Sequence, residues 1–398
     1  MTTKGRKLIR KDYDPGHIFR RIRPVAHEIR PGGSGRTPRS AMRWELWGKS
    51  LKFAFLMVYI SQEGEVIRTD RALDAVIDLY DAWKGGLPEI TLTTSGSTGP
   101  PKCIALSREA ILASVKLTVD AFDLSSSDFF LCNLNTDYIG GKMMVIRAAE
   151  TGADLMAVAP SVNPFADLEN QVSLFARNRG RNFFSFVPMQ LQHILRHDDP
   201  TALLRTAKAI LAGGGPVAED TRRKIQELEL PVFETYGMTE TISHIALKDL
   251  RTDDTFFTAL PGVSLDTDQH GCLKIKSPST LGQWIITHDV VEMTAPEKFI
   301  LKGRRDNIIN SGGVKIQAEE VERAIAQTFP GLPDFFCYGL PDTTLGQRLV
   351  LVLEGEGPEP DLSRLDLPRY HIPKEIIRVR AFVKTPTGKT DKIKTIEK

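Results

Sequence analysis

Five short apolar runs between residues 129 and 237 constrain the fold of this chain more than any other feature. Each run has six or seven residues and is bounded by turn-forming residues, and helical segments separate most of the runs. The runs are FFLCNL (129–134), ADLMAVA (153–159), FFSFVP (183–188), AILAGG (209–214) and PVFETYG (231–237). Strands that are apolar throughout and alternate with helices are typical of a mostly parallel sheet with helices on its faces. We therefore expect an α/β fold.

Two helices and one strand are predicted before these runs. Residues 69–83 place apolar side chains on one helical face, with Thr69 or Asp70 as the cap. Residues 90–94 form a short strand, and Ser107 caps a second helix. The first apolar face comprises Leu73, Val76, Ile77 and Tyr80, and the second comprises Ile111, Ser114, Val115 and Phe122.

The pattern changes after residue 270. Residues 271–277 and 284–293 alternate between apolar and polar side chains, which predicts a small antiparallel sheet. Beyond GRRDN (303–307) a helix is expected over 317–329, with strands near 335–339 and 348–355 and a lysine-rich tail. We therefore divide the chain into three predicted parts. They are a basic, poorly ordered extension (1–56), a large domain (57–306) and a small mobile α+β domain (307–398).

Composition excludes several classes of protein. The chain has 398 residues, 41% hydrophobic and 26% charged, with a net charge of only +2, so it carries no overall nucleic-acid signal. Its longest apolar run, residues 53–60, is far shorter than a membrane span, and no signal peptide is readable. The cysteines are Cys103, Cys132, Cys272 and Cys337, whose scattered spacing indicates neither a zinc site nor disulfides. Scattered thiols fit the cytoplasm, which is the expected location.

The first 50 residues differ from the rest, with 13 lysines and arginines against four acidic residues. A poorly ordered extension is our first interpretation. A basic arm for an anionic surface and an organelle-targeting peptide stay open, as does a true start near Met57.

TTSGSTGPPK, residues 93–102, is the first stretch that suggests chemistry. Gly96 and Gly99 leave the backbone N–H groups open to a phosphate, and Lys102 adds positive charge. Hydroxyl donors come from Thr94, Ser95, Ser97 and Thr98. The spacing is not that of the P-loop, GxxxxGK[ST], and a plain turn is the alternative.

Three further stretches suggest a nucleotide site. Glu240, at the end of a predicted strand, suits Mg²⁺, and Tyr236 suits stacking on a flat base, although a solvated glutamate and a buried aromatic are equally open. Asp289 and Arg304 are residue types that bind ribose hydroxyls. Lys389 follows a turn glycine near the terminus, where an ordinary surface cation is the alternative.

In order and spacing, these stretches together resemble the adenylate-forming superfamily of acyl-CoA synthetases, luciferases and peptide-synthetase adenylation domains. The resemblance implies a nucleotide site formed by Thr94, Ser95, Gly96, Ser97, Thr98, Gly99, Lys102, Gly213, Gly214, Gly215, Glu234, Thr235, Tyr236, Gly237, Asp289 and Arg304. It further implies catalytic roles for Lys389, Thr239 and Glu240, a Mg²⁺ site at Glu240 and Thr98, and a hinge at Asp306. Ser311, Gly312 and Gly313 would line the path of coenzyme A.

The chain is short for this superfamily before the phosphate loop, and it resembles one branch, the o-succinylbenzoate–CoA ligases of menaquinone synthesis. Residues 137–165, 236–247 and 306–316 carry this resemblance. It implies ATP, Mg²⁺ and coenzyme A as cofactor and co-substrates, and a small carboxylate as substrate. Tyr138, Gly141 and Lys142 fall where the acyl pocket begins.

Several questions stay open in the sequence. Lys142 or Arg147 is available for the second carboxylate of o-succinylbenzoate, and His244 is interpreted as a core histidine. Lys392 replaces the usual arginine after the terminal lysine motif. The alternatives in function are a ligase for another aryl or acyl carboxylate, a non-catalytic nucleotide-binding relic, and a basic-arm nucleic-acid protein. Both a monomer and a homodimer are compatible with the sequence.

Overall fold

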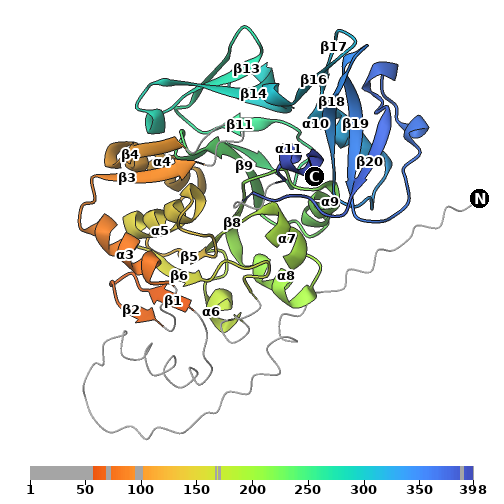
Figure 1. Ribbon diagram of the computed structural model, residues 1–398. Coiled ribbons are helices and arrows are strands. Elements are labelled where there is room, and N and C mark those ends of the chain that lie inside the picture. The colour runs from red at the N-terminus through yellow and green to blue at the C-terminus, as the bar shows by residue number, and fades with distance from the viewer. Residues whose placement is uncertain are drawn as a thin grey trace, which may run out of the picture. The chain divides into compact units, whose positions relative to one another are not determined.

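A sheet of 13 strands forms the framework of the chain up to Arg304 (Figure 1). The computed structural model describes residues 57–68, 73–94, 102–165, 168, 172–385 and 390–397. The predicted basic extension and the predicted caps Thr69 and Asp70 lie outside these residues. No helix among the described residues has the length and apolar character that crossing a membrane requires.

The helices are α3 (Asp74–Lys84), α4 (Arg108–Phe122), α5 (Ile139–Thr151), α6 (Val172–Arg177), α7 (Pro188–Ile194), α8 (Asp198–Leu204), α9 (Glu219–Glu227), α10 (Ala318–Thr328) and α11 (Lys392–Ile396). The first ten strands are β1 (Met57–Ile60), β2 (Val66–Arg68), β3 (Glu89–Thr94), β4 (Lys102–Ser107), β5 (Phe129–Cys132), β6 (Asp154–Val158), β7 (Asn182–Phe186), β8 (Ala207–Ala212), β9 (Val232–Met238) and β10 (Ser243–Asp249). The others are β11 (Phe257–Ala259), β12 (Ser264–Thr267), β13 (Cys272–Lys276), β14 (Trp284–Ala295), β15 (Lys298–Arg304), β16 (Ile308–Ser311), β17 (Val314–Gln317), β18 (Phe335–Asp342), β19 (Gly346–Glu354) and β20 (Glu375–Val379).

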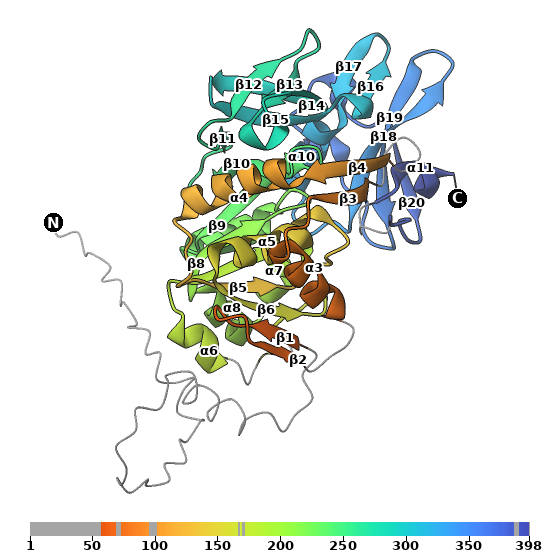
Figure 2. The same cartoon turned by 90° about the vertical axis from the view of Figure 1, so that its left-hand side faces the viewer.

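The five apolar runs form β5 to β9, as predicted, and these strands pair in parallel in the order β6-β5-β7-β8-β9. The expectation of a mostly parallel sheet is correct only for this middle section. Antiparallel strands continue the sheet on both sides, β1 and β2 beyond β6 and β10 to β15 beyond β9 (Figure 2). The predicted small antiparallel sheet is therefore part of the large one, because β10 and β11 join it edge to edge.

Helices cover both faces of the parallel section. On one face α3, α4 and α5 pack their apolar sides on β1 and on β5 to β8, which explains the periodicity of the predicted helices. Ser107 caps α4 by accepting a hydrogen bond from the Ala110 N–H, as predicted. On the other face, rings from β5, β7 and α6 pack edge to face with Phe165. The sheet is thus buried on both sides where the strands are parallel.

The strand predicted at 90–94 exists as β3, but it does not join the parallel sheet. It pairs antiparallel with β4, a strand that the sequence analysis did not predict, and the two form a separate hairpin. The hairpin lies beside α4 in both views (Figures 1 and 2). Residues 95–101, the core of the predicted phosphate loop, connect its two strands.

The chain beyond Arg304 builds a second sheet of five strands, in the order β17-β16-β19-β18 with β20 beside β19. Helix α10 packs its apolar face, including Val321 and Ile325, on β18 and β19. This agrees with the helix and strands predicted for residues 317–355. The division of the chain at residue 306 remains a prediction.

Candidate active site

The carboxyl ends of β5, β7, β8 and β9 lie at one edge of the sheet, because these strands are parallel. In open α/β sheets this edge is where ligands bind. Residues 133–138 follow β5, Gly213 to Gly215 follow β8, and Thr239 and Glu240 follow β9. The fold therefore brings together residues predicted for the acyl, nucleotide and metal sites, although some of them are about 100 positions apart in the sequence.

Two glycines at this edge are required by close packing. A Cβ atom on Gly237 would lie 2.1 Å from the Ser243 carbonyl oxygen, because Gly237 sits against the start of β10. A Cβ atom on Gly213 would lie 2.8 Å from Thr235 Oγ1. A side chain at Gly237 would have to move backbone, and one at Gly213 would have to displace the Thr235 side chain, so the GGG and ETYGMTE segments pack closely against each other. This explains why glycine stands in both predicted motifs.

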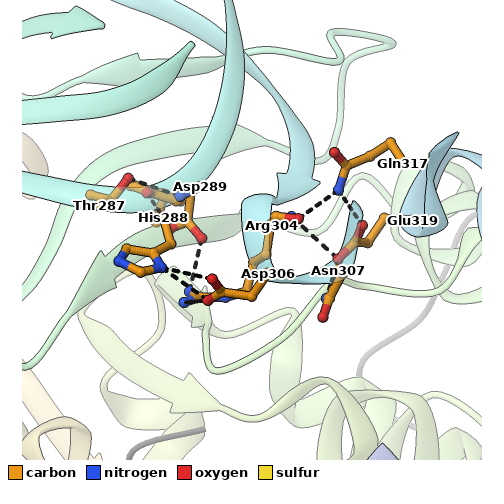
Figure 3. Close-up of polar contacts among 9 residues, drawn as sticks. Thr287, His288, Asp289, Arg304, Asp306, Asn307, Gln317 and Glu319 are labelled. Atoms are coloured by element: carbon orange, nitrogen blue, oxygen red, sulfur yellow. Dashed lines mark hydrogen bonds and ion pairs between the residues drawn. The ribbon is translucent and has the colours of Figure 1, made fainter. Parts of the chain in front are cut away.

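Asp289 on β14 is the centre of a polar cluster at this edge (Figure 3). Tyr236 donates its hydroxyl to Asp289 Oδ2 at 2.6 Å, and Arg304 Nη1 donates to Asp289 Oδ1 at 3.0 Å. Burial, followed by the charge of Asp289, raises the pKa of Tyr236 well above its ordinary value, so its hydroxyl stays protonated. The structure thus joins the three residues predicted for the adenosine part of a nucleotide. That Tyr236 stacks on a base remains a prediction, since its ring packs between Phe257 and Phe299.

The predicted hinge residue Asp306 extends the same cluster. His288 Nδ1 lies 2.9 Å from Asp306 Oδ1, and Arg304 Nη2 lies 3.2 Å from Asp306 Oδ2. Burial acts to raise the pKa of Asp306, but the hydrogen bonds from His288 and Arg304 outweigh it, and the pKa lies below its usual value. Sequence reasoning missed His288, although it stands inside the THD stretch that supplied Asp289.

A second carboxylate, Glu319 at the start of α10, binds the residues on either side of Asp306. It accepts hydrogen bonds from the Arg304 N–H and from the side chains of Asn307 and Gln317. A Cβ atom on Gly303 would lie 2.3 Å from the ends of both Gln317 and Glu319. No local sequence signal identified Glu319, because Arg304 and Asn307 precede it by 15 and 12 residues (Figure 3).

Glu240 and Glu234 have different surroundings. Glu234 is buried and forms an ion pair of 2.5 Å with Lys248 on β10, so its charge is already compensated. Glu240 is exposed in the turn between β9 and β10, and it pairs with no cation among the described residues. A carboxylate oxygen that is free of partners suits Mg²⁺, whereas one held by a lysine does not. Thr239 lies in the same turn, where its carbonyl accepts from the Ile242 N–H.

Several predicted residues lie outside the described residues, namely Ser95, Gly96, Ser97, Thr98, Gly99 and Lys389. The backbone places Thr94 and Lys102 as partners at the loop end of the β3–β4 hairpin. The hairpin therefore brings both ends of the predicted phosphate loop together. Ser311, Gly312 and Gly313 form the tight turn between β16 and β17, in which both glycines have positive φ. A turn explains these glycines locally, and their contact with coenzyme A remains a prediction.

At the predicted acyl pocket, Tyr138 is partly exposed and directly precedes α5. Gly141 lies so close to Asn135 that a Cβ atom would be 2.4 Å from its carbonyl oxygen. Lys142 is half-buried, and burial lowers its pKa, opposed by the charge of Asp137. Arg147 and His244 are both buried, in agreement with a core position for the histidine.

Comparisons with known proteins agree with this geometry. A family model described as AMP-binding enzyme matches residues 89–268. A crystal structure from Dyadobacter fermentans, described as an acyl-CoA synthetase (AMP-forming)/AMP-acid ligase II-like protein, is 36% identical, covers 86% of this chain and 99% of that one, and has a TM-score of 0.57. The chain belongs to the AMP-binding enzyme family. The predicted enzyme class, an AMP-forming acyl-CoA synthetase, agrees with these matches.

Within the AMP-binding enzyme family, two curated relatives carry a more specific name. A probable 2-succinylbenzoate–CoA ligase of Mycobacterium tuberculosis is 28% identical over 81% of this chain and 90% of its own length. A 2-succinylbenzoate–CoA ligase of Enterococcus faecalis is 26% identical over 75% of this chain and 67% of its own length. The o-succinylbenzoate coenzyme A synthetase of Bacillus subtilis, solved with ATP and magnesium, shares the fold at 20% identity, with a TM-score of 0.66 over 77% of this chain and 69% of that one.

Proposed function

We propose that this protein activates o-succinylbenzoate with ATP and transfers the acyl group to coenzyme A. The products are o-succinylbenzoyl-CoA, AMP and pyrophosphate. The observation that carries the proposal is the match to the Mycobacterium tuberculosis relative, which extends over 90% of that protein and is not limited to the shared nucleotide motifs. A step of this kind acts on a small acid in the cytoplasm, which is the proposed location.

In the first half-reaction, a carboxylate oxygen of the acid attacks the α-phosphorus of ATP, and pyrophosphate leaves. Two anions must meet, so positioning and charge neutralisation supply most of the rate. Asp289 and Arg304 hold the ribose hydroxyls, and Tyr236 keeps the Asp289 carboxylate in a fixed orientation through its 2.6 Å hydrogen bond. The bare backbone of Gly213 to Gly215 lies beside the adenine.

The phosphates are held from the other side of the site. The loop from Thr94 to Lys102 wraps the β- and γ-phosphates, and Thr239 contacts the α-phosphate. Glu240, with Thr98, would hold Mg²⁺, which when bound would neutralise charge on the phosphate oxygens. Lys389 bridges the attacking carboxylate and the nucleotide.

In the second half-reaction, the sulfur of coenzyme A attacks the acyl carbon, and AMP leaves. The residues beyond the hinge at Asp306 rotate between the two steps, which withdraws Lys389 and brings the turn of Ser311, Gly312 and Gly313 to the pantetheine path. Lys389 therefore matters for adenylate formation and much less for thioester formation.

Pyrophosphate release by the purified protein with Mg·ATP tests this proposal. The acids to compare are o-succinylbenzoate, benzoate and a medium-chain fatty acid, each with and without coenzyme A. We expect release with o-succinylbenzoate, and a thioester once coenzyme A is added. Release with one of the other acids, and none with o-succinylbenzoate, would mean that the mechanism is correct and the proposed substrate is wrong. Nucleotide binding without release from any acid would favour the non-catalytic relic.

A further inference from the structure

The turn between β9 and β10, which carries Thr239 and Glu240, has strained backbone. Ile242 and Ser243 have φ angles of 55° and 74°, in the left-handed region that favours glycine. A β-branched residue such as isoleucine is rare there, because its side chain crowds the backbone. Strain of this kind persists only where the surrounding structure enforces it, and it is concentrated at functional sites.

The other described residues with this backbone conformation stand in a different context. Apart from glycines, they are Asp123, Glu229 and Leu281, and each lies just beyond the end of a helix. A left-handed residue commonly ends a helix, so these three positions need no further explanation. In the turn between β9 and β10, by contrast, two such residues follow one another and no helix ends there.

The hydroxyl group of Thr241 closes this turn from within. Its Oγ1 atom accepts a hydrogen bond from the Met238 N–H at 3.0 Å, and it lies 2.8 Å from the Ser243 carbonyl oxygen and 3.1 Å from that of Met238, the acceptors for its proton. Met238 is the last residue of β9 and Ser243 the first of β10, so one side chain joins the two strands where the turn leaves the sheet. Thr241 is fully buried, so it acts on the turn and not on a ligand.

Two serines from other elements hold the same turn from outside. Ser279, in the 3₁₀ helix Pro278–Thr280, donates to the Thr241 carbonyl at 2.9 Å, and Ser114 on α4 donates to the Ile242 carbonyl at 2.5 Å. Both serines are buried, and buried hydrogen bonds are costly to leave unmade. The left-handed backbone is therefore enforced by bonds from three separate parts of the chain.

The enforced conformation separates the exposed residues of the turn from the buried ones. Glu240 is exposed and Thr239 is partly exposed, whereas the next two residues, Thr241 and Ile242, are buried. The Ile242 N–H donates to the Thr239 carbonyl at 3.0 Å, which links the two halves. Mg²⁺ demands a nearly ideal octahedral arrangement of ligands, and a displacement of about 1 Å can cost a factor of about 100 in rate. The position of the Glu240 backbone therefore matters for a metal held there.

We propose that Thr241 is a positioning residue for adenylate formation. Its hydroxyl, supported by Ser279 and Ser114, keeps the turn in the strained conformation that presents Glu240 to Mg²⁺ and Thr239 to ATP. The inference rests on the proposed function, which assigns those two residues to the metal and the α-phosphate. The second half-reaction starts from an acyl-adenylate, from which pyrophosphate has already left, and so it depends on this turn much less.

Nucleotide binding to the full-length protein, measured by isothermal titration calorimetry, tests the proposal without turnover. Thr241→Val keeps the shape of the side chain and removes its hydroxyl. We expect this change to raise the Kd for Mg·ATP about tenfold or more, and the Kd for AMP, which needs no metal, less than about threefold. Thr241→Ser returns the hydroxyl and should bind Mg·ATP within about threefold of wild type.

The two half-reactions provide a second measurement. In Thr241→Val, half-maximal pyrophosphate release should need about tenfold more Mg²⁺, whereas thioester formation from o-succinylbenzoyl-adenylate and coenzyme A should stay within about threefold of wild type. A variant that was merely less stable would slow both half-reactions equally. Thr206→Val is the matched control, because it removes a buried threonine hydroxyl at the opposite edge of the sheet, before β8, and should leave the Mg²⁺ dependence unchanged.

The outcomes separate the inference from the proposed function. A wild type that binds Mg·ATP and releases pyrophosphate with no acid refutes the proposed function, and the comparison of Mg·ATP with AMP still decides the role of Thr241. Wild-type Mg·ATP binding in Thr241→Val, or equal weakening of Mg·ATP and AMP, refutes the inference. Should Thr241→Val fail to fold, Ser279→Ala should raise the Kd for Mg·ATP about threefold or more, and an unchanged Kd would equally refute it. A wild type that does not bind Mg·ATP refutes both.

Discussion

At the scale of single residues, Asp289 divides its two carboxylate oxygens between a tyrosine and an arginine. Both partners are fixed by other strands, so the carboxylate has one orientation before any nucleotide arrives. In the proposed reaction this preorganisation lowers the cost of binding the ribose, since little side-chain freedom remains to be lost.

Asp289→Asn should therefore weaken ATP binding more than it slows the chemical step. The amide keeps the shape but loses the ion pair with Arg304, and a hydrogen bond to a charged group contributes about 1.5–3 kcal/mol. We expect the KM for ATP to rise about tenfold or more, as measured by pyrophosphate release at varied ATP. Asp266→Asn, which removes a surface partner of Lys274, is the matched control. An unchanged KM in Asp289→Asn would remove this residue from the nucleotide site.

His244 makes the folded protein sensitive to acid. Its pKa in the folded state lies below its ordinary value, so on acidification the unfolded chain takes up a proton at this position before the folded one. Stability from this source is complete above about pH 6.5 and is lost as the pH falls below it. Urea unfolding at pH 7 and 5.5 should show wild type losing about 1 kcal/mol more than His244→Gln. The control variant His270→Gln, which changes an exposed histidine, should lose as much stability as wild type. Equal losses of stability in all three proteins would contradict the role of His244.

At the scale of elements, residues 303–307 are held by two carboxylates on opposite sides. Asp306 is bound by His288 and Arg304, and Glu319 accepts from the backbone of Arg304 and the side chain of Asn307. The segment between β15 and β16 is thus fixed at both ends, which is unusual for a connection that is proposed to rotate. Each hydrogen bond contributes about 1 kcal/mol, so a few bonds are enough to set the balance between two arrangements.

Glu319→Ala should loosen this segment. The variant removes the acceptor of three hydrogen bonds, and we expect trypsin to cut after the exposed Arg305 about fivefold faster or more, since one lost bond of about 1 kcal/mol corresponds to that factor. Glu320→Ala on the same helix has no such partners among the described residues and should be cut at the wild-type rate. Equal rates for both variants would show that Glu319 does not hold the segment.

At the scale of the whole molecule, one sheet carries the described parts of the proposed nucleotide site, apart from Thr94 and Lys102 on the β3–β4 hairpin. Its parallel centre is covered on one face by α3, α4 and α5 and on the other by a group of phenylalanines. Phe184 is fully buried in that group, in contact with Phe165, Phe175 and Phe186. The site therefore depends on packing that lies far from any ligand.

Phe184→Ala should lower the free energy of unfolding by about 3–5 kcal/mol, because the ring leaves a cavity that its neighbours cannot fill. Denaturant unfolding measures this value. Phe256→Ala, whose ring is half-exposed beneath the Lys298 ammonium group, should cost less than about 1 kcal/mol. A loss below about 1 kcal/mol for Phe184→Ala would mean that the phenylalanine group is not a rigid core.

Local sequence patterns predicted the strands β5 to β9, the cap at Ser107 and the apolar face of α3. Periodicity and capping depend on residues that are close together in the sequence, so they can be recognised from it directly. The same patterns did not predict β4 or the continuity of the large sheet. Strand pairing depends on residues far apart in the sequence, and the alternation of apolar and polar residues in one strand does not indicate which strand pairs with it. For the same reason the motifs identified Asp289 and Arg304, whereas the contacts of His288 and Glu319 became visible only in three dimensions. The roles of Lys389 and the phosphate loop remain predictions.

Gly303 is a position where folding and the proposed turnover depend on the same contact. Its missing side chain leaves room for the ends of Gln317 and Glu319, which would otherwise lie 2.3 Å from a Cβ atom. Those two side chains are already engaged, so they cannot move aside without giving up their bonds to Arg304 and Asn307. Gly303 lies in β15 and Gln317 is the last residue of β17, so the methyl group added by Gly303→Ala would press on both sheets. We therefore expect this change to lower the yield of folded protein as well as the rate of product formation.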